Sequence, residues 1–558
     1  MLRNRPTSSR FGVRTVLAGI VLAGIGSCQP TSPAADTTPQ FLSFSDLVTL
    51  SVADPVPPPL ADRLDALLES PIVNNDATRS GVQPRRPSVD GPGQVVRVAL
   101  WNIERGLQFD MIRLAFSDPD EFERVAAQKG GLDGDTVSIG RQLRILRDAD
   151  IIILNEVDLG MKRTDYRDIA RELAKALGMN YAFGVEFVEV DRLVDLGLDP
   201  VALEDPDQAR QMQDELRADS ERYKGLHGNA ILSRYPIEHA RIVRLNVCHD
   251  WFAAEKAEIS ALEKGKRLAL NKLFLERIER EVRRGGRMAL IADVRVPGLP
   301  EDSVSVVDVH LENKCKPRCR SRQMEALLTQ IKDIDHPVII GGDLNTSGAD
   351  GTPTSIRREI MERVKNYEFW ATQALKWATP ASLPLLALTP VRYFKNYLDP
   401  TSVHLPILAG NSEAGLFRRV ERFRFTDHGA FDFRGDTERN LHLKERTLAN
   451  SNQRARKGFE PTFVMKGDFG GLVGRYKLDW FFIKAFIPRP RGAGMSYRFA
   501  PHFPLTMRDL NGAVPDGVSD HAPMTVDLPF SDPLLVSPEE RLPGDASDGN
   551  RETIVAKP

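Results

Sequence analysis

One stretch decides the fold class of this chain: Val338-Ile-Ile-Gly-Gly-Asp343-Leu-Asn345-Thr346. A short apolar run bounded by glycine predicts a buried β-strand. The strand ends in a carboxylate and an amide two residues apart, and in an extended chain such side chains point to the same side. Oxygen donors at the edge of a sheet are suited to holding a hard divalent cation.

Five further segments follow the same pattern, in which an apolar run adjoins Asp, Asn, Glu or His. A single polar residue beside a strand usually begins an ordinary loop, so the prediction of a site depends on all six segments occurring in one chain. We expect Asp520 and His521, like Asp343, to lie just past a buried strand, and Asp479 to enter one. The five segments are Val96-Arg-Val-Ala-Leu-Trp-Asn102, Ile151-Ile-Ile-Leu-Asn-Glu156, Val304-Ser-Val-Val-Asp-Val-His310-Leu-Glu-Asn313, Tyr476-Lys-Leu-Asp479 and Gly517-Val-Ser-Asp520-His521.

Taken in this order, the segments resemble the endonuclease/exonuclease/phosphatase superfamily, to which deoxyribonuclease-I-like enzymes belong. Gly228-Asn229-Ala230-Ile-Leu-Ser also looks like the central strand of that family. Helical stretches near 138–149 and 166–177 alternate with the strands, which indicates an α/β class. The resemblance implies an α/β (α+β) four-layer sandwich, in which two packed β-sheets are flanked by helices and the active site lies on loops at one end.

The resemblance assigns a metal-binding group and a catalytic group. Glu156 would be the main metal ligand, with Asn102 beside it and Asp520 as a nearby carboxylate. Oxygen donors favour Mg²⁺, Mn²⁺ or Ca²⁺ over zinc. The catalytic and substrate-binding residues would be Asp343 as the base that activates water, His521 as the catalytic histidine, Asp479 as its orienting carboxylate, His310 as a phosphate-contacting group, and Asn345 and Asn313 as phosphate-binding amides.

The expected activity is metal-dependent hydrolysis of phosphate esters, with a nucleic acid, a phospholipid or an inositol phosphate as substrate. Two alternatives remain open. The chain could be a catalytically silent envelope-binding protein that keeps the fold, because a fold alone does not give a function. It could also be a zinc-dependent hydrolase, and the spacing of His310, Cys315 and Cys319 allows a zinc site.

Both ends of the chain differ in composition from its middle. Residues 1–28 have a basic start, a short apolar run and the sequence Ile25-Gly-Ser-Cys28, which resembles a bacterial lipoprotein processing box. Cleavage before Cys28 would attach a lipid to its sulfur, whereas a cut near Ser32-Pro-Ala34 would release a secreted protein. We therefore expect an exported protein held at the cell envelope on the periplasmic or outer-membrane face. We also expect a disordered tether over 29–93, with a short helix near 60–68, a catalytic domain over 94–529, and a disordered tail over 530–558.

Three stretches within the domain are longer than compact connections require, namely 186–224, 250–284 and 347–473. The last would contain a helix near 355–372 and an apolar stretch over 380–391. Phe417-Arg-Arg-Val-Glu-Arg-Phe-Arg-Phe, within the same insertion, is interpreted as a strand with one charged face. Lys314-Cys-Lys-Pro-Arg-Cys-Arg-Ser-Arg322 is either a grip for an anionic substrate or a solvated loop, with the next helix starting near Arg322.

Charge and cysteine content limit the remaining choices. The formal net charge is −2, with 75 basic and 77 acidic residues, which argues against tight nonspecific duplex binding driven by net charge. With Cys28 used by an anchor, the expected disulfide joins Cys315 to Cys319, or one of them to Cys248, and leaves one thiol free. The sequence gives no sign of oligomerisation, so a monomer is expected.

Overall fold

The computed structural model describes the part of the chain that forms the folded domain. The described residues are 35–90, 92–131, 135–200, 205–257, 281–346, 400–401, 413–435, 447–455, 458–464, 475–484, 487–488, 497–498, 502–515 and 517–530. All of them belong to one compact unit, residues 33–558. Within the described residues, no helix is both long enough and apolar enough to cross a bilayer.

The larger of the two main sheets has nine strands. Seven of them lie side by side in the order β1-β5-β6-β4-β3-β20-β19, while β2 pairs with β3 and β8 pairs with β5. Strands β3 and β4 run parallel, whereas β20 runs antiparallel to β3. Strand β6, expected as the central strand of the family, lies in the interior of this sheet. The strands are β1 (Ile72–Asn74), β2 (Ser88–Val89), β3 (Gly93–Arg105), β4 (Ile151–Leu159), β5 (Asn180–Glu189), β6 (Leu226–Ser233), β8 (Arg283–Gly285), β19 (Leu505–Thr506) and β20 (Met524–Pro529).

The second sheet has five strands in the order β16-β11-β10-β9-β7. Strands β10 and β11 are parallel, and β16 is antiparallel to β11. Its strands are β7 (Ile237–Arg244), β9 (Met288–Arg295), β10 (Ser303–Val309), β11 (Val338–Asp343) and β16 (Asp479–Ile483). The predicted strand Val338–Asp343 therefore lies inside a buried sheet.

Alternation along the strands explains why the two sheets pack face to face. In β3, Val98 and Leu100 point into the core between the sheets, while Ala99 and Trp101 point outward to a second apolar core. In β10, Val306 faces the same inner core and Val307 faces a third core on the far side. Successive side chains of a strand point to opposite faces, so a strand buried on both faces is apolar throughout.

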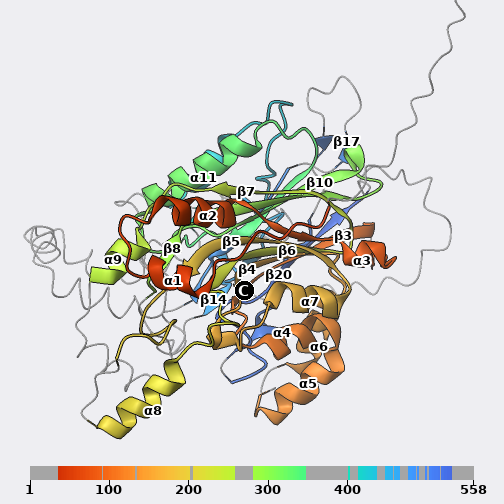
Figure 1. Cartoon of the computed structure of the whole chain (residues 1–558). Helices are drawn as coiled ribbons and strands as arrows, with labels where there is room; N and C mark the ends of the chain where they lie inside the picture. The colour runs from red at the N-terminus through yellow and green to blue at the C-terminus, as the bar shows by residue number, and fades with distance from the viewer. Residues whose placement is uncertain are drawn as a thin grey trace, which may run out of the picture. The chain divides into compact units, whose positions relative to one another are not determined.

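Helices cover the outer face of each sheet, which gives four layers (Figure 1). Helices α4 (Phe109–Ser117), α5 (Pro119–Gln128), α6 (Thr136–Arg147) and α7 (Ile169–Leu177) cover the larger sheet, and α11 (Pro317–Ile331) and α15 (Ala414–Arg422) cover the smaller one. The predicted four-layer sandwich and the two predicted helical stretches near α6 and α7 are confirmed. Among the described residues, the other helices of four residues or more are α1 (Phe44–Leu50), α2 (Pro58–Glu69), α3 (Asp76–Arg79), α8 (Pro206–Leu216), α9 (Trp251–Ala257) and α16 (Arg508–Asn511).

The expected tether is wrong for residues 35–90, which belong to the domain. Strand β1 pairs with β5, and Leu47, Leu64 and Leu67 are buried in the core of the larger sheet. Leucines at helical spacing in α1 and α2 supply enough apolar surface to fix the segment, despite its Pro, Ser and Asp content. The helix expected near 60–68 is confirmed as α2. The remaining boundaries stay predictions, because residues 1–34 and 531–558 lie outside the described residues.

Two local predictions are also wrong. The Phe417 segment forms helix α15 instead of a strand, because Leu416, Phe417 and Val420 share one buried face at helical spacing. Helix α11 starts at Pro317, five residues before the expected start, since proline fits the first turn of a helix. The helix expected near 355–372 and the apolar stretch over 380–391 lie outside the described residues. The other strands are short ladders, namely β12 (Arg454–Ala455) with β13 (Gly458–Phe459), β14 (Phe463–Val464) with β15 (Arg475–Tyr476), and β17 (Ile487–Pro488) with β18 (Tyr497–Arg498).

Candidate active site

The topology brings the polar ends of six strands to one end of the two sheets. Parallel pairing places the C-terminal ends of β3 and β4 together, and those of β10 and β11 together. Strands β16 and β20 are antiparallel to β11 and β3, so they contribute their N-terminal ends at the same place. For this reason the expectation that Asp520 and His521 lie past a strand is wrong: they precede β20, which begins at Met524.

The best-defined part of the site is a buried contact among Asp343, Asp479 and His521. The Nδ1 atom of His521 lies 2.8 Å from Asp479 Oδ2, and its Nε2 atom lies 3.7 Å from Asp343 Oδ2. The two aspartates face each other in the register of β11 and β16. The ring of His521 also packs edge-on against Phe463, with 5.0 Å between ring centroids. Asp479 therefore orients the imidazole towards Asp343.

Burial sets the charges of this group. Although burial disfavours the imidazolium, the charge and hydrogen bond of Asp479 raise the pKa of His521 well above its ordinary value. Burial raises the pKa of Asp343, against the opposing charge of His521. Burial also penalises the Asp479 carboxylate, but His521 lowers the pKa of Asp479 overall. At neutral pH, His521 is therefore an imidazolium and its partner Asp479 is a carboxylate; we call this pair the His521–Asp479 dyad.

Asn102 connects this group to Glu156. Its amide Nδ2 donates to Glu156 Oε1 at 3.2 Å and to Asp343 Oδ2 at 3.3 Å. Although burial disfavours a carboxylate, the positive charges of Arg105 and of the His521 imidazolium favour it, and the pKa of Glu156 is lowered overall. Glu156 also has a positive φ of 53°, where β3 and β4 lose register. Backbone strain of this kind is common at functional sites, and here it marks the position of the ionised carboxylate.

His310 lies on the other side of Asp343, directly after β10. Its Nε2 atom lies 3.7 Å from Asp343 Oδ2, so two imidazoles flank one carboxylate. The backbone N–H of Asn345 donates to Asp343 Oδ1 at 2.8 Å, and its side-chain amide donates to the Leu311 carbonyl at 2.9 Å. Asn345 thus fixes the loop around Asp343, with its expected role towards phosphate still a prediction.

Asp520 and Asn313 lie at the margin of this cluster. The backbone N–H of Asp520 donates to Glu104 Oε2 at 3.0 Å, and its carboxylate is one of the charges that raise the pKa of His521. Asn313 accepts from Arg287 at 3.4 Å through its side-chain oxygen. Glu104 and Arg287 therefore link Asp520 and Asn313 to the site. Metal binding by Asp520 and phosphate binding by Asn313 stay predictions.

The donors present suit a divalent cation. Glu156 is ionised, and oxygen donors of the carboxylate and amide type are those that Mg²⁺ and Ca²⁺ prefer. Asp479 Oδ1 is buried without a hydrogen-bond partner among the described residues. Glu156, which accepts from the Asn102 amide, could therefore hold a metal ion, and the ligand roles expected of Asn102 and Asp520 stay predictions.

Sequence reasoning missed three residues that shape the site: Glu104, Glu186 and Arg287. Glu186 is a completely buried carboxylate on β5, and a charged residue between the apolar Val185 and Phe187 was a signal that could have revealed it. Glu104 follows Asn102 by two residues, with a φ of 47°. Arg287 lies in the short connection between β8 and β9, where no sequence pattern distinguishes it from a surface arginine.

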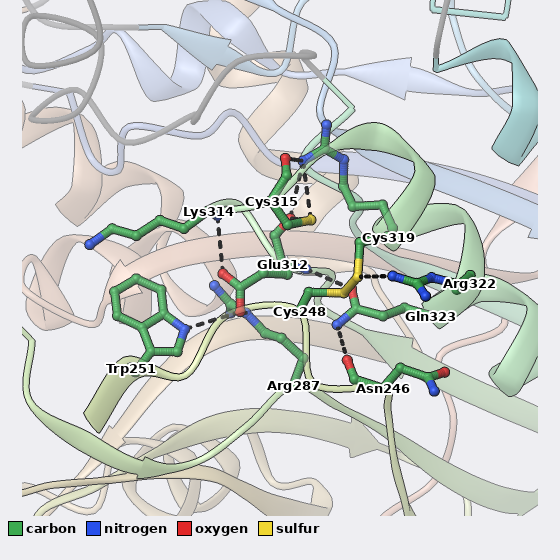
Figure 2. Close-up of a disulfide and its surroundings, with 11 residues drawn as sticks. Asn246, Cys248, Trp251, Arg287, Glu312, Lys314, Cys315, Cys319, Arg322 and Gln323 are labelled. Carbon is green, nitrogen blue, oxygen red and sulfur yellow. Dashed lines mark hydrogen bonds and ion pairs between the residues drawn. A yellow bond between two sulfur atoms is a disulfide. The ribbon is translucent and has the colours of Figure 1, made fainter. Parts of the chain in front are cut away.

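The cysteine region settles two open alternatives. Cys248 and Cys319 form a disulfide of 1.98 Å, and Cys315 is free (Figure 2). A zinc site from His310, Cys315 and Cys319 is therefore wrong, because Cys319 is no longer available as a thiolate. The basic stretch is also largely engaged: Lys314 pairs with Glu255, and the buried Arg320 pairs with Glu413. Salt bridges, rather than a substrate grip, account for these two cations.

Comparison with known proteins decides the family. The sequence profile of the endonuclease/exonuclease/phosphatase family matches residues 99–381, just over half of the chain. This chain belongs to the endonuclease/exonuclease/phosphatase family. Members of the family are hydrolases that act on phosphate esters, and they generally depend on a divalent metal. No curated protein matches the chain in sequence.

Solved structures of the family are similar at low sequence identity. An endonuclease/exonuclease/phosphatase from Beutenbergia cavernae DSM 12333 is 14% identical, with a TM-score of 0.33, over 78% of this chain and 71% of that chain. An endonuclease/exonuclease/phosphatase family protein from Leptotrichia buccalis C-1013-b is 10% identical, with a TM-score of 0.32, over 78% of this chain and 99% of that chain. A 3′ phosphatase from Neisseria, bound to a product DNA hairpin, is 12% identical, with a TM-score of 0.34, over 78% of this chain and 99% of that chain.

Proposed function

We propose that this protein is a divalent-metal-dependent phosphoesterase of the cell envelope, hydrolysing phosphodiester or phosphomonoester bonds, with Mg²⁺ as its ion and Mn²⁺ or Ca²⁺ as substitutes. The observation that carries the proposal is the position of Asp343, whose carboxylate lies 3.7 Å from the Nε2 atoms of both His310 and His521. Asn102 connects the same carboxylate to the ionised Glu156.

Each group has a step in this reaction. Asp343 orients the attacking water and takes its proton, because a raised pKa makes an ionised aspartate a stronger base. The His521 imidazolium holds the negative charge that develops on the phosphate, and Asp479 keeps it protonated. His310 contacts a phosphate oxygen from the opposite side. A cation held by Glu156, with Asn102 and Asp520, would neutralise the phosphate charge.

The substrate class is left to experiment. A nucleic acid, a phospholipid and an inositol phosphate each carry the required ester. The tether to a membrane expected from Cys28 favours a lipid, whereas the basic stretch that favoured a nucleic acid is partly engaged in salt bridges. The alternative of a silent binding protein predicts no turnover on any of them.

Hydrolysis tests the proposal directly. The chain from residue 35 is assayed on bis-p-nitrophenyl phosphate, p-nitrophenyl phosphate, plasmid DNA, RNA, sphingomyelin and inositol phosphates, with Mg²⁺, Mn²⁺, Ca²⁺ or EDTA. Turnover should require the metal and should fall by about 10²- to 10⁴-fold in Asp343→Asn, the range for loss of a general base. Asp333→Asn is the matched control, because Asp333 is exposed just before β11, at the other end of the strand from Asp343.

Unchanged turnover in Asp343→Asn would contradict the mechanism. A folded wild-type protein without turnover on every substrate would favour the silent binding protein. Metal-independent turnover would contradict the role of Glu156.

A further inference from the structure

Arg287 is a buried arginine behind His310. It is 4% exposed, and its Nη1 atom lies 2.8 Å from His310 Nδ1 and 3.1 Å from Glu186 Oε2. Its Nη2 atom donates to Asn313 Oδ1 at 3.4 Å, and its Nε atom lies 3.6 Å from Glu312 Oε2. Figure 2 shows Arg287 and Trp251 both directed at Glu312. The guanidinium is thus held between two carboxylates while it contacts the histidine.

The contact with His310 assigns the proton of that ring. A guanidinium has only N–H donors and does not lose its proton in proteins, so the His310 Nδ1 atom must be the acceptor. A neutral imidazole with an accepting Nδ1 carries its proton on Nε2. The Nε2 atom is the one that lies 3.7 Å from Asp343.

Glu186 makes the arginine necessary. Its Oε2 atom lies 3.5 Å from the same His310 Nδ1, and although burial penalises the carboxylate, the charge of Arg287 lowers the pKa of Glu186. An ionised carboxylate at that distance would favour a proton on Nδ1, and so the opposite tautomer or an imidazolium. Because Arg287 binds both Glu186 and Nδ1, it occupies the position that this proton would take.

We propose that Arg287 is a positioning residue that holds His310 neutral, with its proton on Nε2, so that the ring offers a fixed N–H donor beside Asp343. The two histidines around Asp343 then differ in charge: His521, paired with Asp479, is an imidazolium, and His310, paired with Arg287, is neutral. Neighbouring groups that differ in this way commonly divide the tasks of a reaction between them. The catalytic consequence rests on the proposed phosphoesterase function, but the tautomer does not.

The tautomer is measured without substrate. In ¹⁵N-histidine-labelled protein, two-bond ¹H–¹⁵N correlations distinguish protonated from unprotonated ring nitrogens, and His310 is assigned by its absence from the His310→Gln spectrum. We expect an unprotonated Nδ1 and a protonated Nε2 in the wild type. A proton on Nδ1, or on both nitrogens, would overturn the inference even for a protein without enzymatic activity.

Variants test the role of the arginine. In Arg287→Met the proton should move to Nδ1 towards Glu186, whereas Arg287→Gln keeps an amide donor and should retain the wild-type tautomer. With a substrate in hand, kcat should fall by about 10²-fold in Arg287→Met, with KM changing less, and recover in part in Arg287→Gln. An unchanged tautomer in Arg287→Met would refute positioning by Arg287.

Arg97→Met is the matched control. Arg97 is also buried and paired with a carboxylate, donating to Asp527 at 2.6 and 2.9 Å, but it contacts neither histidine. It should lose stability with little change in kcat and with the wild-type His310 spectrum. An equal loss of kcat in Arg97→Met and Arg287→Met would show that buried arginines act only on stability, and the proposal would be wrong.

Discussion

Single residues set the charge of this site, and the His521–Asp479 dyad shows how. Asp479 accepts from His521 Nδ1 at 2.8 Å in a buried position, and this contact raises the pKa of His521. The raised pKa keeps the ring protonated through neutral pH, so the stabilising charge is present below that pKa and is lost as pH rises through it.

Replacement of Asp479 by Asn should therefore change both the rate and its pH dependence. The amide cannot stabilise the imidazolium as a carboxylate does, so the pKa of His521 should fall. We expect kcat to drop by about 10²- to 10⁴-fold, and the alkaline limb of the pH–kcat profile to move to lower pH. The measurement is kcat between pH 5 and pH 10 for both proteins, and an alkaline limb at its wild-type position would refute this role of Asp479.

A second residue-scale prediction concerns Lys477, which is fully buried beside Met524 Sδ at 2.9 Å. Burial lowers its pKa from 10.5 to about 7. Between these values the unfolded chain binds more protons than the folded chain, so the free energy of unfolding rises with pH over that interval. Lys477→Met should raise the free energy of unfolding by a few kcal/mol below pH 7, and by little above pH 10.5.

Urea unfolding at pH 6 and pH 10.5 measures this difference. Lys332→Met is a suitable control, because Lys332 is exposed after α11 and its charge needs no desolvation. An equal gain in Lys477→Met at both pH values would mean that packing, instead of the charge of Lys477, causes it.

At the scale of elements, the sequence predicted what alternation and apolar runs determine. Strands such as β10 and β11 are apolar on both faces, and each adjoins a polar residue, so their position and their site residues were predictable. The same reasoning failed where composition and periodicity disagreed. The segment 417–425 is interpreted from its sequence as a strand with one charged face, whereas Leu416, Phe417 and Val420 share one buried face of helix α15.

The N-terminal segment is the clearest element-scale error, and it leads to a prediction. Removal of residues 1–94 would delete β1, α1 and α2, including six buried leucines of α1 and α2, each stabilising the fold by about 1.5–3 kcal/mol. Their sum approaches the total stability of a typical domain. A protein starting at Val95 should therefore aggregate or melt well below one starting at residue 35.

Thermal unfolding and size-exclusion chromatography compare the two proteins. Removal of 531–558, all but the first residue of the predicted disordered tail 530–558, is the control and should leave the melting temperature unchanged. If the protein starting at Val95 has the same melting temperature as the one starting at residue 35, the N-terminal segment contributes nothing to stability and the contacts of β1 with β5 are dispensable.

For the whole molecule, the site exists only because two sheets meet. The amide of Asn102, on β3 of the larger sheet, donates to Asp343 of β11 in the smaller sheet, and His521, which precedes β20 of the larger sheet, contacts the same carboxylate. Sequence patterns give the residues at strand ends, and the family resemblance gives their roles. Neither gives partners such as Arg287, Glu186 and Glu104, because those contacts depend on how the sheets are placed, which no local pattern encodes.

The last whole-molecule prediction concerns the proposed envelope location. With the chain expressed in a bacterium that has an outer membrane, cleavage before Cys28 would add acyl chains, and two or more anchor a protein stably. The wild type should incorporate labelled palmitate and enter the detergent phase, whereas Cys28→Ser should do neither. Cys315→Ser is the control, because Cys315 is a free cysteine inside the folded domain, and this variant should keep the label.

An unlabelled wild type released into the medium would favour cleavage near Ser32-Pro-Ala34, as in an ordinary secreted protein, and would contradict the anchor. Retained hydrolysis by the unanchored Cys28→Ser protein on a soluble substrate, with loss only on vesicles, would then identify a membrane lipid as the substrate that the anchor serves.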